Sequence, residues 1–260
     1  MKHTFAICAY KNSPFLEGCI KSIINQSVKS DVIICTSTPN VYIDEIAAKY
    51  EIDVFVNEVS AGISSDWNFA YEKASTNLVT IAHQDDIYLK DYAKTVLKMK
   101  EKYPDMSLFC SSSVTAKGGK LIQFGMIELI KKFLRTPLRI RALSDKTFIK
   151  LMPLRFGNPI ICPSCAYSKE LCGENLFVSN LSFALDWEVL VKLAKKEGRF
   201  IVSEKPLIIY RVHDESETKA AIMDDRRSKE ESEMFDRLLP KFLSNIIKKA
   251  YRSSYDAYTK

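Results

Sequence analysis

Short apolar runs alternate with helical patterns along the first 115 residues of the chain. Runs rich in Val, Ile, Phe and Cys predict buried strands, at 4–10, 31–35, 52–57, 78–82 and 107–112. Between these runs, apolar residues recur every three or four positions and predict helices, at 15–24, 41–50, 64–74 and 92–103. Since strands separated by helices of this length pair side by side, we expect an α/β fold with a mostly parallel central sheet flanked by helices.

The second half of the chain has a less regular pattern. Loop and strand character returns at 157–167, a helix is predicted at 185–197, and short strands are predicted at 200–203 and 206–211. From about residue 217 to residue 260 the pattern is charged and helical, with one break at Pro240. We therefore expect one α/β domain made of the halves 1–118 and 119–216, followed by a C-terminal helical extension at 217–260.

The composition excludes several classes of protein. Hydrophobic residues make up 47% and charged residues 27% of the 260 residues, which are ordinary values for a globular protein. No apolar stretch reaches the length of a membrane span, and the run at 5–10 ends at Lys11, too soon for a secretory signal. The seven cysteines have no disulfide-framework spacing. We expect a cytoplasmic protein with reduced thiols.

The positive charge of the chain is concentrated in one segment. Residues 126–156 hold eight basic and two acidic residues, a balance of +6 that equals the net charge of the whole chain. Aliphatic residues outnumber aromatic ones there, which favours an anionic membrane surface or a lipid-linked acceptor over stacked bases. A solvated helix pair with a basic outer face is the other interpretation. We expect no nucleic acid partner.

The best candidate for chemistry follows the predicted strand 78–82. There the sequence reads His83, Gln84, Asp85 and Asp86. Adjacent carboxylates repel each other, and Mg²⁺ or Mn²⁺ would relieve that repulsion while leaving positions for substrate phosphates. The alternative is a cluster of acids at the start of the helix 92–103.

Two further polar groups follow later in the chain. Asp186 opens an apolar helical run, and Arg211 and His213 end the predicted strand 206–211. Each has an ordinary explanation, as an acid in a first helical turn or as charge at a sheet edge. In sheets of this type, however, ligands bind beyond the carboxyl ends of the strands. Together these groups therefore indicate one site.

These motifs resemble, in the right order, those of the family 2 glycosyltransferases of the GT-A fold. The segments that carry the resemblance are AYKN at 9–12, SIINQ at 22–26, GISSDWN at 62–68, QDD at 84–86, LDWE at 185–188 and YRVHDES at 210–216. Three departures stand out: His83 replaces an acid, residues 35–38 lack the acidic segment that contacts the base, and Trp67 replaces an arginine.

The resemblance implies an inverting, metal-dependent glycosyltransferase. Its donor would be a nucleoside diphosphate sugar, most simply a UDP-sugar, and its acceptor a hydroxyl of a glycan or a lipid-linked glycan. The half 1–118 would bind the nucleotide sugar and the half 119–216 the acceptor. The implied site residues are Asp186 as the general base; Asp85, Asp86 and His213 as ligands of Mn²⁺ or Mg²⁺; and Ala9, Tyr10, Thr36, Asn68, His83, Gln84 and Arg211 as donor-binding residues.

The resemblance also implies a place of action, the inner face of the cell membrane, where the protein would be peripheral through 126–156. Two alternatives stay open. A sugar nucleotidyltransferase would share the sheet and the carboxylates, but the segment 8–14 lacks the glycine-rich loop expected of one. A non-catalytic membrane-associated scaffold protein would explain the basic segment alone.

Overall fold

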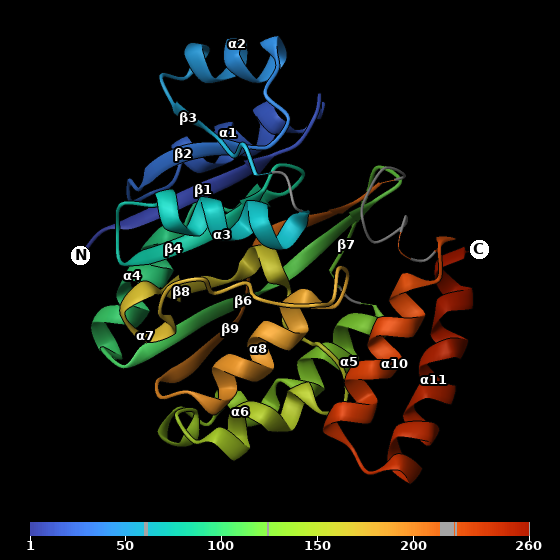
Figure 1. Cartoon of the computed structure of the whole chain (residues 1–260). Coiled ribbons are helices and arrows are strands. Elements are labelled where there is room, and N and C mark those ends of the chain that lie inside the picture. Colours follow the sequence, from blue (N-terminus) through green and yellow to red (C-terminus); the bar gives the residue numbers. More distant parts are fainter. Residues whose placement is uncertain (60–61, 124, 214–220, 222, 260) are drawn as a thin grey trace.

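The computed structural model describes residues 1–59, 62–123, 125–213, 221 and 223–259 (Figure 1). The strands are β1 (His3–Ala9), β2 (Asp31–Thr36), β3 (Asp53–Val56), β4 (Leu78–His83), β5 (Ile87–Tyr88), β6 (Met106–Lys117), β7 (Lys120–Ile122), β8 (Ala166–Ser168) and β9 (Arg199–Val212). The α-helices are α1 (Leu16–Ile24), α2 (Val41–Lys49), α3 (Ile63–Lys73), α4 (Tyr92–Lys102), α5 (Met126–Leu134), α6 (Thr147–Leu154), α7 (Lys169–Cys172), α8 (Leu185–Lys195), α10 (Arg226–Leu238) and α11 (Lys241–Thr259). Single turns of 3₁₀ helix lie at η1 (Thr136–Arg139), η2 (Arg141–Leu143) and η3 (Cys162–Ser164).

The expected α/β architecture is confirmed, with a sheet of mixed direction. The strand order is β3-β2-β1-β4-β8-β6-β9-β5, with β7 paired to β6. Strands β3, β2, β1 and β4 run parallel, as the alternating pattern predicts, and β6 runs parallel to β9. The short strand β8 joins these two groups and is antiparallel to both of its neighbours. The sheet is therefore not purely parallel.

Each face of the sheet is covered by its own layer of helices. Alternate residues of β1 belong to different cores: Phe5 and Ile7 pack with α1, α2 and α4, whereas Ala6 packs with α3, α8 and α10. This division follows from the two-residue period of a strand, which sends successive side chains to opposite faces. The core on the second face also takes residues from α10, such as Phe235. The C-terminal helices thus complete the α/β domain (Figure 1).

The two short strands expected at 200–203 and 206–211 are one strand, β9. It runs beside β6, and the register between the two strands shifts around Ser112, which pairs with Pro206. Proline has no N–H to donate to a ladder, so a strand that contains one needs an irregularity at that point. The shift lets β9 continue past Pro206 to Val212, which carries Arg211 to the site described below.

The basic segment 126–156 folds as helix α5, two 3₁₀ turns and helix α6. Pro137 lies in the first turn of η1, and α5 ends before it, because proline is not tolerated in the interior of a helix. The charges were expected to face outward, and that expectation is wrong for Arg135, which is 0% exposed. Its guanidinium lies 3.2 Å from the Glu204 carboxylate and donates a 2.9 Å hydrogen bond to the Pro159 carbonyl. This charge is paired inside the protein and is not accessible to a ligand.

Among the helices that the structure describes, none combines the length and apolar character needed to cross a membrane.

Candidate active site

The carboxyl ends of three parallel strands meet at one edge of the sheet. Ala9 at the end of β1 is in register with Thr36 at the end of β2, and Cys8 is in register with His83 at the end of β4. The segments that follow these strands therefore begin side by side. Tyr10 and Gln84 show this directly: the Tyr10 N–H donates to Gln84 Oε1 at 2.9 Å, and Gln84 Nε2 donates to the Tyr10 carbonyl at 3.1 Å.

This two-point contact makes Gln84 a positioning residue for Tyr10. The Tyr10 side chain is 51% exposed, so its ring is free to contact a bound molecule. Ala9 is 3% and Thr36 2% exposed, and Thr36 Oγ1 accepts a 3.0 Å hydrogen bond from the Thr38 N–H. Thr38 Oγ1 in turn accepts one from the Lys11 N–H at 2.7 Å. The loops after β1 and β2 are thereby fixed to each other.

Asp85 and His213 approach each other from opposite halves of the chain. The imidazole Nε2 of His213 lies 3.2 Å from Asp85 Oδ2, and Ser13 Oγ donates to Asp85 Oδ1 at 3.1 Å. His213 Nε2 is buried and has no hydrogen-bond partner within the described part of the chain. A divalent cation could bind between these two side chains, because such ions take carboxylate oxygens and imidazole nitrogens as ligands.

The described residues could supply only part of a coordination shell. No group of three or more His, Cys, Asp or Glu side chains placed to hold a metal ion occurs among the described residues. Asp85 and His213 therefore offer two ligands, and a cation there would keep positions for water or for substrate oxygens.

Asp86 connects the loop after β4 with the end of β9. Its side chain is 2% exposed, and its Oδ1 accepts a 2.9 Å hydrogen bond from the Arg211 N–H. Burial raises the pKa of Asp86 to about 8. The Arg211 guanidinium donates to the Asp85 carbonyl and stacks 4.3 Å from the centre of the Phe15 ring. Asp86 and Arg211 thus hold the loop that carries Asp85 in place.

His83 and Trp67 form an aromatic wall at the end of β4. Their ring centres are 5.1 Å apart, with an angle of 31° between the planes. Burial lowers the pKa of His83 to about 4, so the imidazole is neutral at physiological pH. Its Nε2 is buried and makes no hydrogen bond to any described residue. The wall is therefore able to stack against a ring or to donate or accept one hydrogen bond.

Asn68, expected to contact the donor, is engaged with the protein backbone. Its Nδ2 donates to the Phe177 carbonyl at 3.2 Å, and its Oδ1 accepts from the Phe177 N–H at 2.8 Å. This pair of bonds fastens helix α3 to the segment before α8, and the Phe177 ring packs 5.2 Å from Trp67. A direct role of Asn68 in donor binding stays a prediction.

Asp66 is a polar residue at the site that the sequence analysis did not single out. Its Oδ2 accepts a 2.9 Å hydrogen bond from Ser37 Oγ after β2, and its Oδ1 accepts one of 2.8 Å from Asn57 Nδ2 after β3. The segment 35–38 lacks an acid, and helix α3 supplies one at the same strand ends. The signal was present in the sequence, because Asp66 stands next to the departure at Trp67.

Asp186 lies in the first turn of α8. Its Oδ2 accepts a 2.9 Å hydrogen bond from Asn158 Nδ2, and its Oδ1 accepts one of 2.7 Å from the Trp187 N–H. The Trp187 indole N–H donates to the Leu154 carbonyl at 2.8 Å, which fixes the start of the helix on α6. Burial raises the pKa of Asp186 to about 6, within the range that suits a general base at neutral pH.

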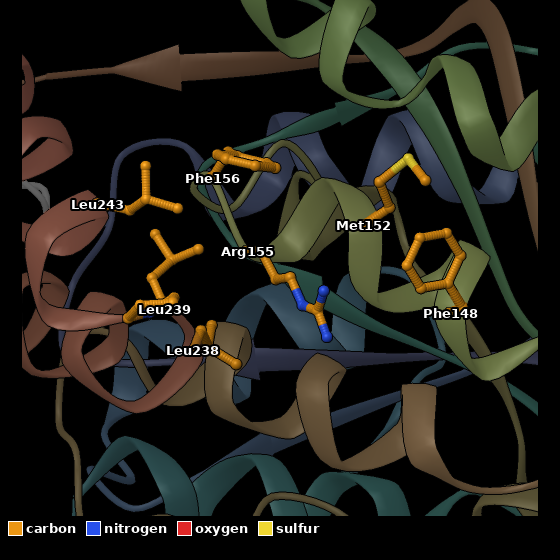
Figure 2. Close-up of a pocket in the computed structure, with 8 residues that line it drawn as sticks. Phe148, Met152, Arg155, Phe156, Leu238, Leu239 and Leu243 are labelled. Carbon is orange, nitrogen blue, oxygen red and sulfur yellow. The ribbon is translucent and has the colours of Figure 1, made fainter.

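A hollow of about 600 Å³ lies between α6 and the turn that joins α10 to α11, and none of the site residues lines it (Figure 2). Its lining is apolar except for Arg155, as Figure 2 shows: Phe148, Met152, Arg155, Phe156, Leu238, Leu239, Pro240 and Leu243. It contains no carboxylate or imidazole, so it does not offer the chemistry found at the strand ends.

Comparison with known proteins agrees with this geometry. The family model described as Glycosyl transferase family 2 matches residues 4–170, and no curated protein matches the sequence. Among solved structures, the chain is similar to TarS from S. aureus in complex with UDP-GlcNAc, at 15% identity and a TM-score of 0.66, over 95% of this chain and 70% of that one.

Two other solved structures have the same fold. A mannosyltransferase from Pyrobaculum calidifontis, in complex with GDP-Man and Mn²⁺, has 16% identity and a TM-score of 0.63 over 96% of this chain and 69% of that one. Glucosyl-3-phosphoglycerate synthase from Mycobacterium tuberculosis, in complex with Mg²⁺ and UDP, has 16% identity and a TM-score of 0.55 over 92% and 80%. Since the family model covers more than half of the chain and the fold is that of GT-A enzymes, the chain belongs to glycosyl transferase family 2 and is a glycosyltransferase.

Proposed function

We propose that the protein transfers a sugar from a nucleoside diphosphate sugar, a UDP-sugar in the first instance, to a hydroxyl of a glycan or lipid-linked glycan. The observation that carries the proposal is the pair of Asp85 and His213, whose facing atoms are 3.2 Å apart beyond the ends of β1, β2 and β4. An edge of this kind is where open α/β sheets bind nucleotides. UDP-GlcNAc and GDP-Man in the similar structures support the choice of donor.

Asp85 and His213 would hold Mn²⁺ or Mg²⁺. The bound cation would supply Lewis-acid stabilisation of the negative charge that develops on the diphosphate leaving group. Asp86 is buried and accepts a hydrogen bond from the Arg211 N–H. It would keep the loop of Asp85 in place, and we propose that it also serves as a direct metal ligand. The Mn²⁺ in the mannosyltransferase complex supports this assignment.

The donor would lie along the segments that follow β1, β2 and β4. Tyr10, held by Gln84, and the wall of His83 and Trp67 offer ring faces for the nucleoside. Ala9, Thr36 and Asn68 would act by fixing the walls of this pocket. The Arg211 guanidinium, beside the Asp85 carbonyl, would balance charge on the diphosphate.

Asp186 would act as the general base of an inverting transfer. The acceptor oxygen attacks the anomeric carbon, its bond to that carbon forms as the bond to the diphosphate breaks, and Asp186 takes the hydroxyl proton. Hydrogen bonds from Asn158 and from the Trp187 N–H aim this carboxylate. We also propose that the enzyme works on the cytoplasmic side, at the inner face of the membrane.

The test is donor turnover by the full chain. A panel of nucleoside diphosphate sugars is incubated with Mn²⁺, with Mg²⁺ or with a chelator, and the released nucleoside diphosphate is measured. Asp85→Ala should abolish metal-dependent turnover and the metal-dependent rise in melting temperature with donor, because it removes both a ligand and a negative charge. Asp44→Ala, at an exposed acid in α2, is the matched control.

Unchanged metal-dependent donor binding in Asp85→Ala would contradict the metal assignment. Release of pyrophosphate from a nucleoside triphosphate, without turnover of any nucleoside diphosphate sugar, would replace the proposed reaction by nucleotidyl transfer.

A further inference from the structure

Helix α5 turns its apolar side outward. Met126, Leu129, Ile130 and Phe133 recur at three- and four-residue intervals, and they are 74, 55, 52 and 76% exposed. An apolar stripe at this spacing ordinarily packs on the core. No residue of α5 is buried, so the helix as a whole rests on the surface.

The opposite side of α5 carries the polar residues. Lys131 Nζ lies 3.7 Å from Glu128 Oε1, and the two side chains are only 28% and 14% exposed. Arg135, one turn later, is the buried partner of Glu204. The helix is therefore amphipathic with its polar side toward the protein, an arrangement that is favourable only if something else covers the apolar side.

The exposed apolar surface continues onto strand β7. Leu121 and Ile122 are 67% and 40% exposed, and Ile122 Cγ2 would lie 3.7 Å from a Cβ on Gly125, the residue before α5. We call the side chains of Leu121, Ile122, Met126, Leu129, Ile130 and Phe133 the α5 surface.

The α5 surface leads back to the site. Strand β7 is the return strand of a hairpin with β6, and Lys117 at the tip of β6 pairs with Val212 of β9. The next residue after Val212 is His213. The hairpin thus connects the candidate metal ligand with the apolar helix.

The exposed charge that flanks the α5 surface along the chain has one sign. The exposed charged side chains next to it along the chain, Lys120, Lys132 and Arg139, are basic. The segment 118–168 has two acids, Glu128 and Asp145, and each is partly buried beside a lysine, at 3.7 and 3.0 Å. An apolar centre with a cationic rim complements a layer of anionic head groups over hydrocarbon.

We propose that the α5 surface inserts into the interface of a bilayer that contains anionic lipids, which deepens the proposed function by naming how the enzyme reaches a lipid-linked acceptor. The apolar side chains enter the boundary of the acyl chains, and the basic rim contacts the head groups. A second copy of the chain is a poorer occupant, because a two-fold contact through this surface would bring the basic rims of both copies together. Arg135 is buried and the apolar stripe is exposed, so lipid contact would come from the apolar side chains together with the exposed basic residues.

The experiment compares sedimentation of the full chain with vesicles of phosphatidylcholine and with vesicles in which phosphatidylglycerol replaces part of it. Wild type should sediment with the anionic vesicles at low salt, and added salt should release part of it. Leu129→Ser/Phe133→Ser should lower vesicle affinity roughly tenfold or more for each side chain removed from the interface. Val41→Ser, at a residue of α2 that is 70% exposed, should change nothing.

A second pair of double variants tests how much the basic side chains contribute to vesicle binding. Lys132→Gln/Arg139→Gln should weaken binding to anionic vesicles and flatten its salt dependence, whereas Lys94→Gln/Lys98→Gln, at exposed residues of α4, should not. Melting temperatures and donor turnover in solution should match wild type in all variants, which separates failure of docking from failure of the proposed reaction.

Equal sedimentation of wild type and Leu129→Ser/Phe133→Ser, or no sedimentation of wild type with either vesicle, would overturn the proposal. So would a wild-type dimer in analytical ultracentrifugation that this double variant converts to a monomer, because the occupant would then be a second copy.

Discussion

Burial and hydrogen bonding affect the charge of the Asp186 carboxyl group in opposite directions. Burial disfavours the carboxylate and is the larger effect, whereas the bonds from the Trp187 N–H and from Asn158 favour it. The result is a pKa of about 6, which keeps the group ionised at neutral pH but more basic than an exposed aspartate. A carboxylate of this kind is suited to accept a proton from a hydroxyl.

Asp186→Asn should abolish transfer while leaving metal and donor binding nearly intact. An amide keeps the shape of the side chain but cannot take a proton, so turnover should fall by roughly 10²–10⁴-fold. Steady-state turnover and calorimetric donor binding measure the two effects. Glu197→Gln, at an exposed acid just after α8, is the control, and wild-type turnover in Asp186→Asn would mean that another group is the base.

The pH dependence of turnover and of stability should report the same ionisation. Turnover at saturating donor should decline as the pH falls through about 6, where Asp186 becomes protonated. The folded-state pKa is raised from 3.8, so Asp186 contributes stability at low pH that is lost as the pH rises through about 6.

Asp186→Asn lacks this titration. Its free energy of unfolding relative to wild type should therefore increase, by up to about 3 kcal/mol, between about pH 4 and pH 8. Denaturant titrations at each pH measure the difference, and a constant difference would show that Asp186 does not titrate abnormally.

At the scale of the elements, the connection after α5 is attached to β9 by the buried Arg135. Its guanidinium contacts Glu204 of β9, Ser112 Oγ of β6 and the Pro159 carbonyl, so one side chain joins the connection after α5 to three other segments. A buried cation destabilises the folded protein unless it is paired and fully hydrogen-bonded. Removing one partner of such a pair therefore lowers the free energy of unfolding, because the other group is left buried without its partner.

Arg135→Leu should lower the free energy of unfolding by about 3 kcal/mol, because it leaves the Glu204 carboxylate and the Pro159 carbonyl without their donor. Arg139→Leu, at an exposed position of η1, should stay within about 0.5 kcal/mol of wild type. Urea titrations measure both values. Similar stabilities for the two variants would contradict the structural role of Arg135.

At the scale of the whole molecule, the first half of the fold was predictable from periodicity. Strands β1 to β4 and the helices between them each carry a clear local pattern, and parallel pairing follows from their alternation. Strand β8 has only three residues, Ala166–Ser168, which is too short for a pattern to give its direction. Its antiparallel pairing is decided by tertiary contacts.

Part of the candidate site was also predictable from the local sequence pattern. Asp85, Asp86 and Arg211 stand at strand ends, and the structure brings these strand ends together. The use of each side chain was not predictable: Asn68 turns to the Phe177 backbone, and Asp66 supplies the acid missing after β2. The spacing of the apolar residues in α5 likewise predicts an apolar stripe, but it does not show whether that stripe faces the protein or the solvent.

The hydrogen bond from the Arg211 N–H to Asp86 joins residues 125 positions apart. The first half of the chain contains the candidate nucleotide-binding loops and the Ser13 contact to Asp85, but it lacks the contacts that Arg211 and His213 make with Asp85. During synthesis the site can assemble only after β9 has left the ribosome and reached the sheet. A nascent or truncated chain that ends before β9 would thus lack Arg211 and His213, so we expect the candidate site to be complete only with the finished sheet.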